Sequence, residues 1–448
     1  MGTSSPNTVS TKLQRIAELA SQAPQMVLTT LHHHIDEELL HEAYRRTRKS
    51  GAPGVDGVTA DQYAVDLESN LGSLLGRLKS GTYQAPPVIR VHIPKGDGRW
   101  TRPIGIPTFE DKILQRAVAM VLEAVYEQDF FDCSYGFRPG RSAHQALQAV
   151  WQSLSGMGGG WVLEVDIQKF FDNLDHGHLR SFLDQRVRDG VLRRAIDKWL
   201  KAGVLDEGCV IHPETGTPQG GVISPLLANI YLHEILDRWF EELIKPRLKG
   251  RAMLVRYADD VVMAFTSEED ARRVLAVLPK RLGRYGLTLH EEKTRLVHFR
   301  RPPDQPMGGP RDKGRRRETF DLLGFTHYWG KSKRGWWVLR RKTARDRFSR
   351  SVRAVSQWCR LYRHNTMAWQ HKHLVLKLRG HCAYYGITGN GRRLWSFRNE
   401  MLRVWRKWLS RRSQRSGICW SRFEDLQRRY PLPPAVVVHS IYRQGAKP

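Results

Sequence analysis

The sequence predicts an α+β protein whose first two thirds mix strands with helices and whose last third is helical and strongly basic. Two apolar segments, Trp161–Ile167 and Ala252–Tyr257, are rich in residues that favour strands. Residues 223–244 and 267–286 are typical of helices, and the second is expected to begin with Ser267 as its N-cap and to end at Gly286. The third observation is an abrupt change in charge near residue 300.

Nearly all of the excess positive charge lies in the last third of the chain. Residues 1–300 contain 38 Lys and Arg against 37 Asp and Glu, whereas residues 301–448 contain 35 basic and 8 acidic residues. Charge of this density repels itself unless it faces a polyanion, and neutralising phosphates releases counterions. An anionic membrane is the alternative, but the Trp and Tyr residues here are spread over helices and loops. Nucleic acid is therefore the favoured partner.

The basic region begins with a stretch rich in Pro, Gly and Arg, residues 300–318, which predicts a loop or hinge. Residues 319–342 are expected to form two short strands around a glycine-containing turn. In residues 392–413, apolar side chains recur at three- and four-residue spacing, which is typical of a helix with one buried side. Its basic residues take the other faces, where we expect phosphate contacts; the alternative is a merely solvated face. They are Arg398, Arg403, Arg406, Lys407 and Arg411.

Several classes of protein are disfavoured by the composition. No run approaches the roughly 18 apolar residues that a membrane span needs, and the N-terminus lacks the apolar core of a signal peptide. Five cysteines lie far apart without a C-x-x-C pair, which favours reduced thiols in a cytoplasmic protein. The consecutive residues His32–His34 point in different directions on a helix, so a metal cluster there is disfavoured.

Carboxylates occur where buried strands should not tolerate them. Asp259 and Asp260 stand side by side inside the apolar run AMLVRYADDVVMAF, and Asp166 ends a comparable run, WVLEVD. A divalent metal would justify three carboxylates at the rim of a sheet, because Mg²⁺ prefers hard oxygen ligands and shares its shell with phosphate. Two such ions roughly 3.5–4 Å apart activate an attacking hydroxyl and stabilise a leaving pyrophosphate. The alternative is an ordinary Asp-Asp turn in water.

An ordered series of motifs extends over residues 30–440. The motifs are GAPGVDGVT, RVHIPKGDGRWTRPIGIPTFEDKILQRAV, SYGFRPGRSAHQAL, VLEVDIQKFFDNLDH, GTPQGGVISPLLANIYL, VRYADD, GLTLHEEKTRLVHF, FDLLGFTHYW and YYGITGNGRRLWSFRNEMLRVWRKWLSRRSQ. This series resembles the reverse transcriptases and maturases of bacterial group II introns. The resemblance implies a right-hand polymerase with fingers, an antiparallel-sheet palm and a helical thumb.

The resemblance implies a division into four parts. Residues 1–90 would form an N-terminal extension and the start of the fingers, and residues 91–299 the interleaved fingers and palm. Residues 300–341 would hold the hinge loop and the last palm hairpin, and residues 342–448 the basic thumb or maturase region. The strand that bears Asp166 and the hairpin with the Asp pair should be neighbours in the palm sheet.

Matched positions carry the family's roles. Asp166, Asp259 and Asp260 would be the catalytic ligands of two Mg²⁺ ions, with Mn²⁺ as the alternative metal and the carbonyl of Ile167 as an extra ligand. Tyr257 would support the primer end.

The resemblance also assigns the nucleotide site. Phe171 fits the aromatic gate that excludes a ribose 2′-hydroxyl, and adjacent Phe170 is the alternative register. Gln219 would line the incoming nucleotide, while Lys95 and Arg102 would bind its triphosphate.

The function implied is an RNA-directed DNA polymerase that also binds its intron RNA to assist splicing and mobility. Its partners would be intron RNA, an RNA template with a DNA primer, dNTPs and target DNA, without a membrane; a homodimer is compatible with the resemblance. The alternatives are a freestanding relative used in DNA repair or antiphage defence, and a splicing cofactor with little polymerase activity. Many relatives carry a nuclease with paired Cys and His after the thumb; no such pair occurs here, so we expect a nick to be supplied elsewhere.

Overall fold

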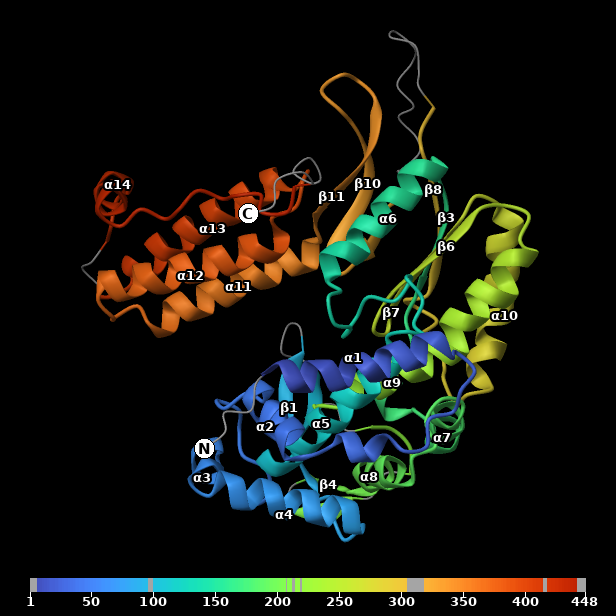
Figure 1. The fold of residues 1–448 in the computed structure, drawn as a ribbon. Helices are drawn as coiled ribbons and strands as arrows, with labels where there is room; N and C mark the ends of the chain where they lie inside the picture. Colours follow the sequence, from blue (N-terminus) through green and yellow to red (C-terminus); the bar gives the residue numbers. More distant parts are fainter. Residues whose placement is uncertain are drawn as a thin grey trace. The chain divides into compact units, whose positions relative to one another are not determined.

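The protein is described by a computed structural model (Figure 1) that covers residues 6–95, 100–206, 208–211, 214–217, 220–303, 318–413 and 417–440. The chain folds into two compact units, each discontinuous in sequence. The first contains Met1–Ala146 and Leu163–Leu296, and the second contains Leu147–Val162 and Val297–Pro448. No helix among the described residues is long and apolar enough to cross a membrane.

The N-terminal helices of the first unit gather around α5 (Phe109–Tyr126), most of whose residues are buried. Thr108 begins α5 by accepting a hydrogen bond from the Asp111 N–H at 3.2 Å. Before α3 (Ala60–Val65) the chain turns at residues 54–57, where the Gly57 N–H donates to the Gly54 carbonyl at 3.0 Å. The gathered helices are α1 (Pro6–Gln22), α2 (Glu37–Arg46) and α3 (Ala60–Val65), followed by α4 (Leu67–Ser80).

A four-stranded sheet in the same unit has the order β2-β1-β4-β5. Its strands β1 and β2 form an antiparallel hairpin, and β1 pairs in parallel with β4. Helices α7 (His176–Asp184) and α8 (Gly190–Lys201) precede β4 in the chain. The strands are β1 (Val88–Lys95), β2 (Trp100–Ile106), β4 (Val204–Asp206) and β5 (Cys209–Ile211).

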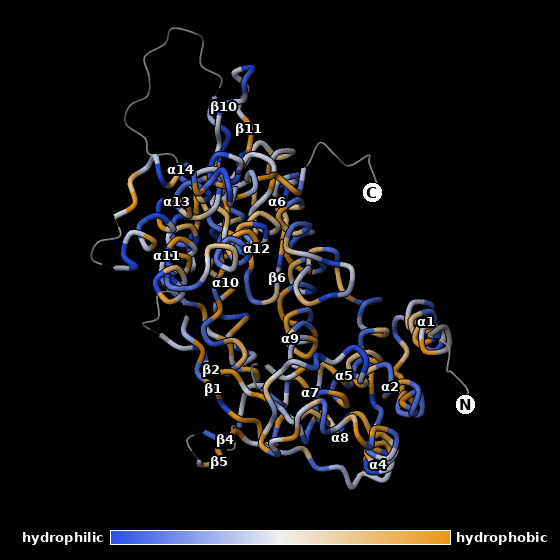
Figure 2. The backbone as a smooth tube through the Cα atoms, turned by 90° about the vertical axis from the view of Figure 1, so that its left-hand side faces the viewer, coloured by the Kyte–Doolittle hydropathy of each residue, from blue (hydrophilic) through white to orange (hydrophobic). Residues whose placement is uncertain are grey.

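The sheet that bears the carboxylates has the order β6-β7-β3-β8, and the chain passes between the two units within β3 and β8. Strand β6 covers the predicted residues Ala252–Tyr257 and pairs antiparallel with β7. Helix α9 (Ser224–Leu232) is largely hydrophobic, as is β6 (Figure 2), and it continues into the π-helical turns η3 (His233–Asp237) and η4 (Trp239–Ile244). The other strands are β3 (Gly159–Val165), β7 (Asp260–Phe265) and β8 (Arg295–Arg300).

Helix α10 (Glu268–Gly283) confirms the predicted helix after β7. The Ser267 hydroxyl accepts a hydrogen bond from the Asp270 N–H at 3.3 Å, so the predicted N-cap is also confirmed. The predicted end at Gly286 is three residues too late. Gly286 has a φ of 72° and belongs to the turn that follows the helix.

The second unit contains α6 (Ala143–Met157), which begins in the first unit, and a three-stranded sheet with the order β11-β10-β9. Two strands were expected here, and the structure has three. The extra turn joins β9 to β10 through Leu323 and Gly324, which have φ angles of 49° and 79°. A two-residue hairpin turn needs positive φ, and leucine at the first position conceals it in the sequence. The strands are β9 (Phe320–Leu322), β10 (Phe325–Lys331) and β11 (Trp337–Thr343).

Four helices complete the second unit, and α11 and α12 both contact α13 (Figure 1). The apolar side predicted for α13 is confirmed, because Leu394, Phe397, Met401, Trp405 and Leu409 are all buried. The indole N–H of Trp405 donates to Gln370 of α12 at 2.9 Å. These helices are α11 (Arg345–Leu361), α12 (Met367–Tyr385), α13 (Gly391–Leu409) and α14 (Trp420–Arg429). Most of the predicted hinge, residues 304–317, lies outside the described residues.

Candidate active site

The Asp pair lies at the turn between β6 and β7, where Tyr257 is paired with Asp260. Ala258, the first turn residue, has a φ of 55°, a conformation that glycine usually supplies at this position. The turn packs against Gly136, where an added Cβ would lie 2.3 Å from the Ala258 nitrogen. Asn229 of α9 fixes Gly136 in turn, since its side-chain amide donates to the Gly136 carbonyl at 2.7 Å.

Asp166 directly follows β3, and β3 is the neighbour of β7 in the sheet. The expectation that the two carboxylate-bearing segments are neighbours is therefore confirmed. The backbone of Asp166 is fixed on both sides: its N–H donates to the Thr294 hydroxyl at 3.4 Å, and its carbonyl accepts from the His290 N–H at 2.8 Å. Adjacent Ile167 forms a bridge with Leu289.

Lys293 forms an ion pair with Asp166, and its Nζ lies 3.5 Å from both carboxylate oxygens. We did not assign Lys293 a role from the sequence, although it belongs to the motif GLTLHEEKT. In the side-chain arrangement of the described residues, no three His, Cys, Asp or Glu groups are close enough to hold a metal. The carboxylates of Asp166, Asp259 and Asp260 are hard oxygen donors and are at least partly exposed to solvent. Mg²⁺ prefers ligands of this kind.

The two phenylalanines after Asp166 have different environments. Phe170 is 2% exposed, and its ring packs on Phe171 and Tyr231 at centroid distances of 5.2 and 6.4 Å. Phe171 is only half-buried, and its carbonyl accepts from the Thr217 N–H at 2.8 Å. Of the two residues, Phe171 is the more exposed to solvent, which favours it over Phe170 as the residue that contacts a ligand.

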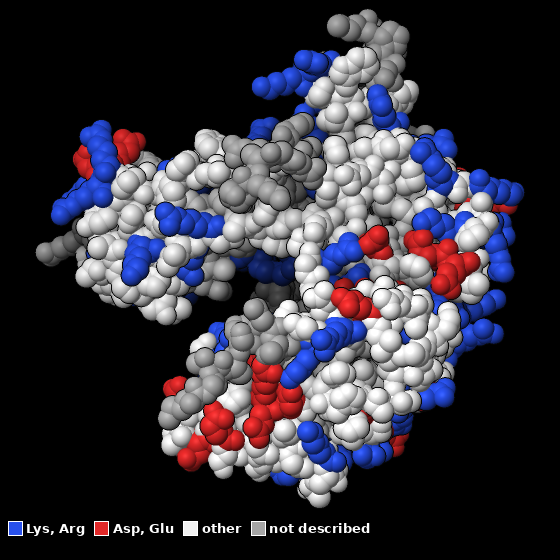
Figure 3. Space-filling model, in the orientation of Figure 1, with Lys and Arg blue, Asp and Glu red and all other residues white. Residues whose placement is uncertain are grey.

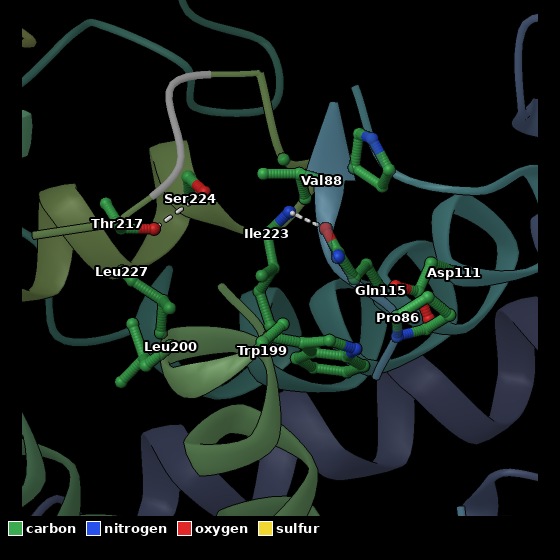
Figure 4. Close-up of a pocket in the computed structure, with 13 residues that line it drawn as sticks. Pro86, Val88, Asp111, Gln115, Trp199, Leu200, Thr217, Ile223, Ser224 and Leu227 are labelled. Carbon is green, nitrogen blue, oxygen red and sulfur yellow. Dashed lines mark hydrogen bonds between the residues drawn. The ribbon is translucent and has the colours of Figure 1, made fainter. Parts of the chain in front are cut away.

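Gln219 of the segment GTPQGG lies outside the described residues, but the chain directly after it packs against β2 at Gly220 and is bound to α5 at Val222 and Ile223. The side-chain oxygen of Gln115 accepts from the Val222 N–H at 2.8 Å and from the Ile223 N–H at 3.4 Å, and Figure 4 draws the bond to Ile223. Gly220 has a φ of 119°, and a Cβ there would lie 2.4 Å from the Gly105 carbonyl oxygen in β2. Gln115 was missed in the sequence, although it is a polar residue within a strongly apolar helix.

Gln115 also lines a small cavity of about 10 Å³, room for one water molecule (Figure 4). Asp111 lines the same cavity, and burial raises the pKa of its carboxyl to about 7. It accepts a hydrogen bond from the Tyr83 hydroxyl, which accepts from the Trp199 indole N–H at 2.8 Å. This buried chain of hydrogen bonds fixes α5 against α8 below the GTPQGG segment.

The other expected nucleotide and primer contacts lie on the first unit. Arg102 is exposed on β2, opposite Ile93 in β1. Lys95 ends β1, but its side chain lies outside the described part of the chain. Tyr257 is half-buried, and its ring centroid lies 6.4 Å from that of the exposed Phe137. Phe137 has a φ of 57°, which turns the chain sharply beside the hairpin.

The basic residues predicted on α13 divide into two groups. Arg398 donates to the carbonyls of Leu432 and Pro433 at 3.0 and 2.9 Å, and Arg406 donates to the carbonyl of Ile418 at 2.8 Å. These two guanidinium groups serve the fold of the unit itself.

The second group is exposed. Arg403 forms an ion pair of 2.8 Å with Glu400, while Lys407 and Arg411 flank the Trp408 ring at 5.7 and 5.4 Å. Figure 3 shows Lys and Arg side chains over the surface of this unit, with acidic atoms near α14. Of the five predicted residues, these three are therefore the ones exposed enough to face a polyanion.

Comparisons with known proteins show the family of this chain. The family described as "Reverse transcriptase (RNA-dependent DNA polymerase)" matches residues 93–327, which include every predicted catalytic carboxylate. The chain belongs to this reverse transcriptase family.

Its relatives include a group II intron-encoded protein, which confirms the resemblance seen in the motifs. The group II intron-encoded protein LtrA of Lactococcus lactis is 34% identical over 280 residues, which cover 60% of this chain and 46% of that protein. This chain therefore spans about half the length of LtrA. Protein YkfC of Escherichia coli is 36% identical over 330 residues, which cover 65% of this chain and 85% of YkfC. A solved structure of telomerase from Candida albicans aligns with a TM-score of 0.43 and 14% identity, covering 78% of this chain and 63% of that one.

Proposed function

We propose that the chain is an RNA-directed DNA polymerase that also binds group II intron RNA and assists its splicing and mobility. The observation that carries the proposal is the placement of Asp166 and of the Asp259–Asp260 turn on adjacent strands in a chain of the reverse transcriptase family. Its substrates are dNTPs and an RNA template with a DNA primer, and target DNA is a further partner. Five free cysteines favour a cytoplasmic location.

In the proposed site, Asp166, Asp259, Asp260 and the Ile167 carbonyl are the ligands of two Mg²⁺ ions. When bound, these ions activate the primer hydroxyl and neutralise the developing pyrophosphate. Arg102 and Lys95 bind the triphosphate, and Tyr257 supports the primer end. Gln219 lines the nucleotide, in a loop that Gln115 anchors through its two backbone hydrogen bonds.

Phe171→Ala should raise ribonucleotide incorporation relative to dNTPs at least about tenfold, a loss of about 1.4 kcal/mol in discrimination. The reason is that the half-buried ring of Phe171 would form the steric wall against the 2′-hydroxyl. The measurement compares kcat/KM for rNTPs and dNTPs on one primer–template. Phe170→Ala is the matched control: it should cost about 3–5 kcal/mol of stability and leave sugar selectivity unchanged. If only Phe170→Ala relaxes selectivity, the gate lies one residue earlier.

Changing Arg403, Lys407 and Arg411 together to Gln should weaken RNA binding and reduce its log–log salt slope by about one unit per lost phosphate contact. Arg398 and Arg406 are left unchanged, because they bind carbonyls within the unit. The measurement is RNA affinity over a salt series, with Arg272, Arg273 and Lys280 of α10 changed to Gln as a control of equal charge. Nucleotide addition on a saturating short primer–template should persist. An unchanged slope would assign the RNA-binding surface to another part of the chain.

A further inference from the structure

Arg256 is a charged residue in the middle of a buried strand. It lies in β6, immediately before Tyr257, and its side chain is 0% exposed. A charge without water is costly unless it is paired and all of its hydrogen-bonding groups are satisfied. Its presence three residues before Asp259 therefore needs a physical reason.

The guanidinium of Arg256 uses all five of its N–H groups. Two donate to the carboxylate of Asp237, which is also 0% exposed, at 2.8 and 2.5 Å. The other three donate to the Ser134 hydroxyl at 2.8 Å, to the Asn229 side-chain oxygen at 2.9 Å and to the Ala258 carbonyl at 3.2 Å. Residue 134, residues 229–237 and the turn at residue 258 thus meet on one side chain.

Two of these contacts lead to the same turn. Arg256 binds the carbonyl of Ala258, the residue directly before Asp259, and it binds Asn229. Asn229 binds the Gly136 carbonyl, and Gly136 packs against the Ala258 nitrogen. The contacts form a closed ring through Arg256, Asn229, Gly136 and Ala258. This ring holds the strained turn at both the nitrogen and the carbonyl of Ala258.

Stability alone does not require this arrangement, because well-packed apolar residues often replace a buried ion pair without loss. Arg186 provides an internal comparison. It is also buried and donates to Asp129 at 2.7 Å, and three further N–H groups bind the carbonyls of Ala20, Ala23 and Met26. Its network fixes an N-terminal segment, whereas that of Arg256 ends at the Asp-bearing turn.

We propose that Arg256, together with Asp237 and Asn229, is a positioning residue that holds the Ala258–Asp259 turn in a single conformation, so that the Asp259 carboxylate is presented in a fixed orientation to metal and primer. This inference rests on the proposed polymerase function. Arg256 touches no substrate; it acts through the turn.

The test compares Arg256→Lys with Arg186→Lys in the full chain. Lysine keeps the positive charge beside the partner carboxylate but loses the planar fork that reaches the other acceptors. Three quantities are measured: the melting temperature, kcat and KM for dNTP addition, and Mn²⁺ affinity of the protein without nucleic acid, by electron paramagnetic resonance. We expect both variants to melt at lower temperature, but only Arg256→Lys to lose about 10–100-fold in kcat and to bind Mn²⁺ more weakly.

A second pair of variants removes one partner of Arg256 each. Asn229→Ala breaks the ring to Gly136, whereas Ser134→Ala removes one side-chain contact from a segment that the Cys133 carbonyl and the Tyr135 N–H still pair with the Arg256 backbone. Asn229→Ala should therefore reduce kcat more than Ser134→Ala at similar stability. Equal losses within both pairs, or wild-type kcat and Mn²⁺ affinity in Arg256→Lys, would overturn the proposal. If the wild-type protein extends no primer, the proposed function fails, and the Mn²⁺ measurement still decides whether Arg256 positions the turn.

Discussion

Asp259→Asn should abolish primer extension on an RNA template, with a loss in rate above about 10³-fold. Such a loss is larger than the contribution of one charge-stabilising hydrogen bond. The amide is nearly isosteric but neutral, so a hard anionic ligand is lost while the β6–β7 turn keeps its shape. RNA affinity should change little, since the exposed basic group of α13 is untouched. The measurement is single-turnover extension beside RNA binding by the same preparation.

Asp61→Asn, on the exposed surface of α3, is the control for loss of one carboxylate and should leave extension unchanged. Asp260→Asn should behave as Asp259→Asn does. Normal extension by the Asp259 variant would contradict both the two-metal site and the polymerase function.

Gly136→Ala should reduce extension by about 100-fold or more, comparable to the loss of a well-placed catalytic hydrogen bond. The added Cβ would lie 2.3 Å from the Ala258 nitrogen and 2.9 Å from the Tyr257 carbonyl carbon. Both are backbone atoms, so the turn itself must shift, and a shift of about 1 Å at a catalytic group costs about 10²-fold. Overpacking should also lower the free energy of unfolding by about 1–3 kcal/mol.

Gly156→Ala in α6 is the control for the same chemical change. A Cβ at Gly156 meets no atom within 4 Å, and alanine is favoured over glycine in a helix by about 1 kcal/mol. This variant should therefore melt at higher temperature and extend primers normally. If Gly136→Ala retains full activity, the hairpin turn tolerates displacement and the packing around it is not needed for function.

Local sequence patterns predicted most of the elements that carry the site. The strand before Tyr257, the helix that follows Ser267 and the buried side of α13 each depend on residues close in the chain, and all three are confirmed. Hydrophobic periodicity and capping are local properties, so one sequence suffices to find them.

The features that escaped prediction depend on partners distant in sequence. Arg256 finds Asp237, Asn229 and Ser134 only after the chain has folded, and nothing near it indicates these acceptors. In the same way, Arg398 and Arg406 bind backbone carbonyls of later segments, which a count of basic residues cannot distinguish from phosphate contacts. The third strand in the sheet of the second unit was not predicted, because Leu323 adopts a conformation that leucine rarely takes.

The interleaving of the two units has a consequence for synthesis on the ribosome. Residues 147–162 belong to the second unit but are made before residues 163–296 of the first. At about 5–20 residues per second, they wait roughly 7–27 s before any of residues 297–448 emerges. During that time the apolar side chains Val150 and Leu154, which are fully buried in the finished protein, lack the later part of their own unit. Nascent chains should therefore be most prone to chaperone capture between the completion of the first unit and the arrival of the second.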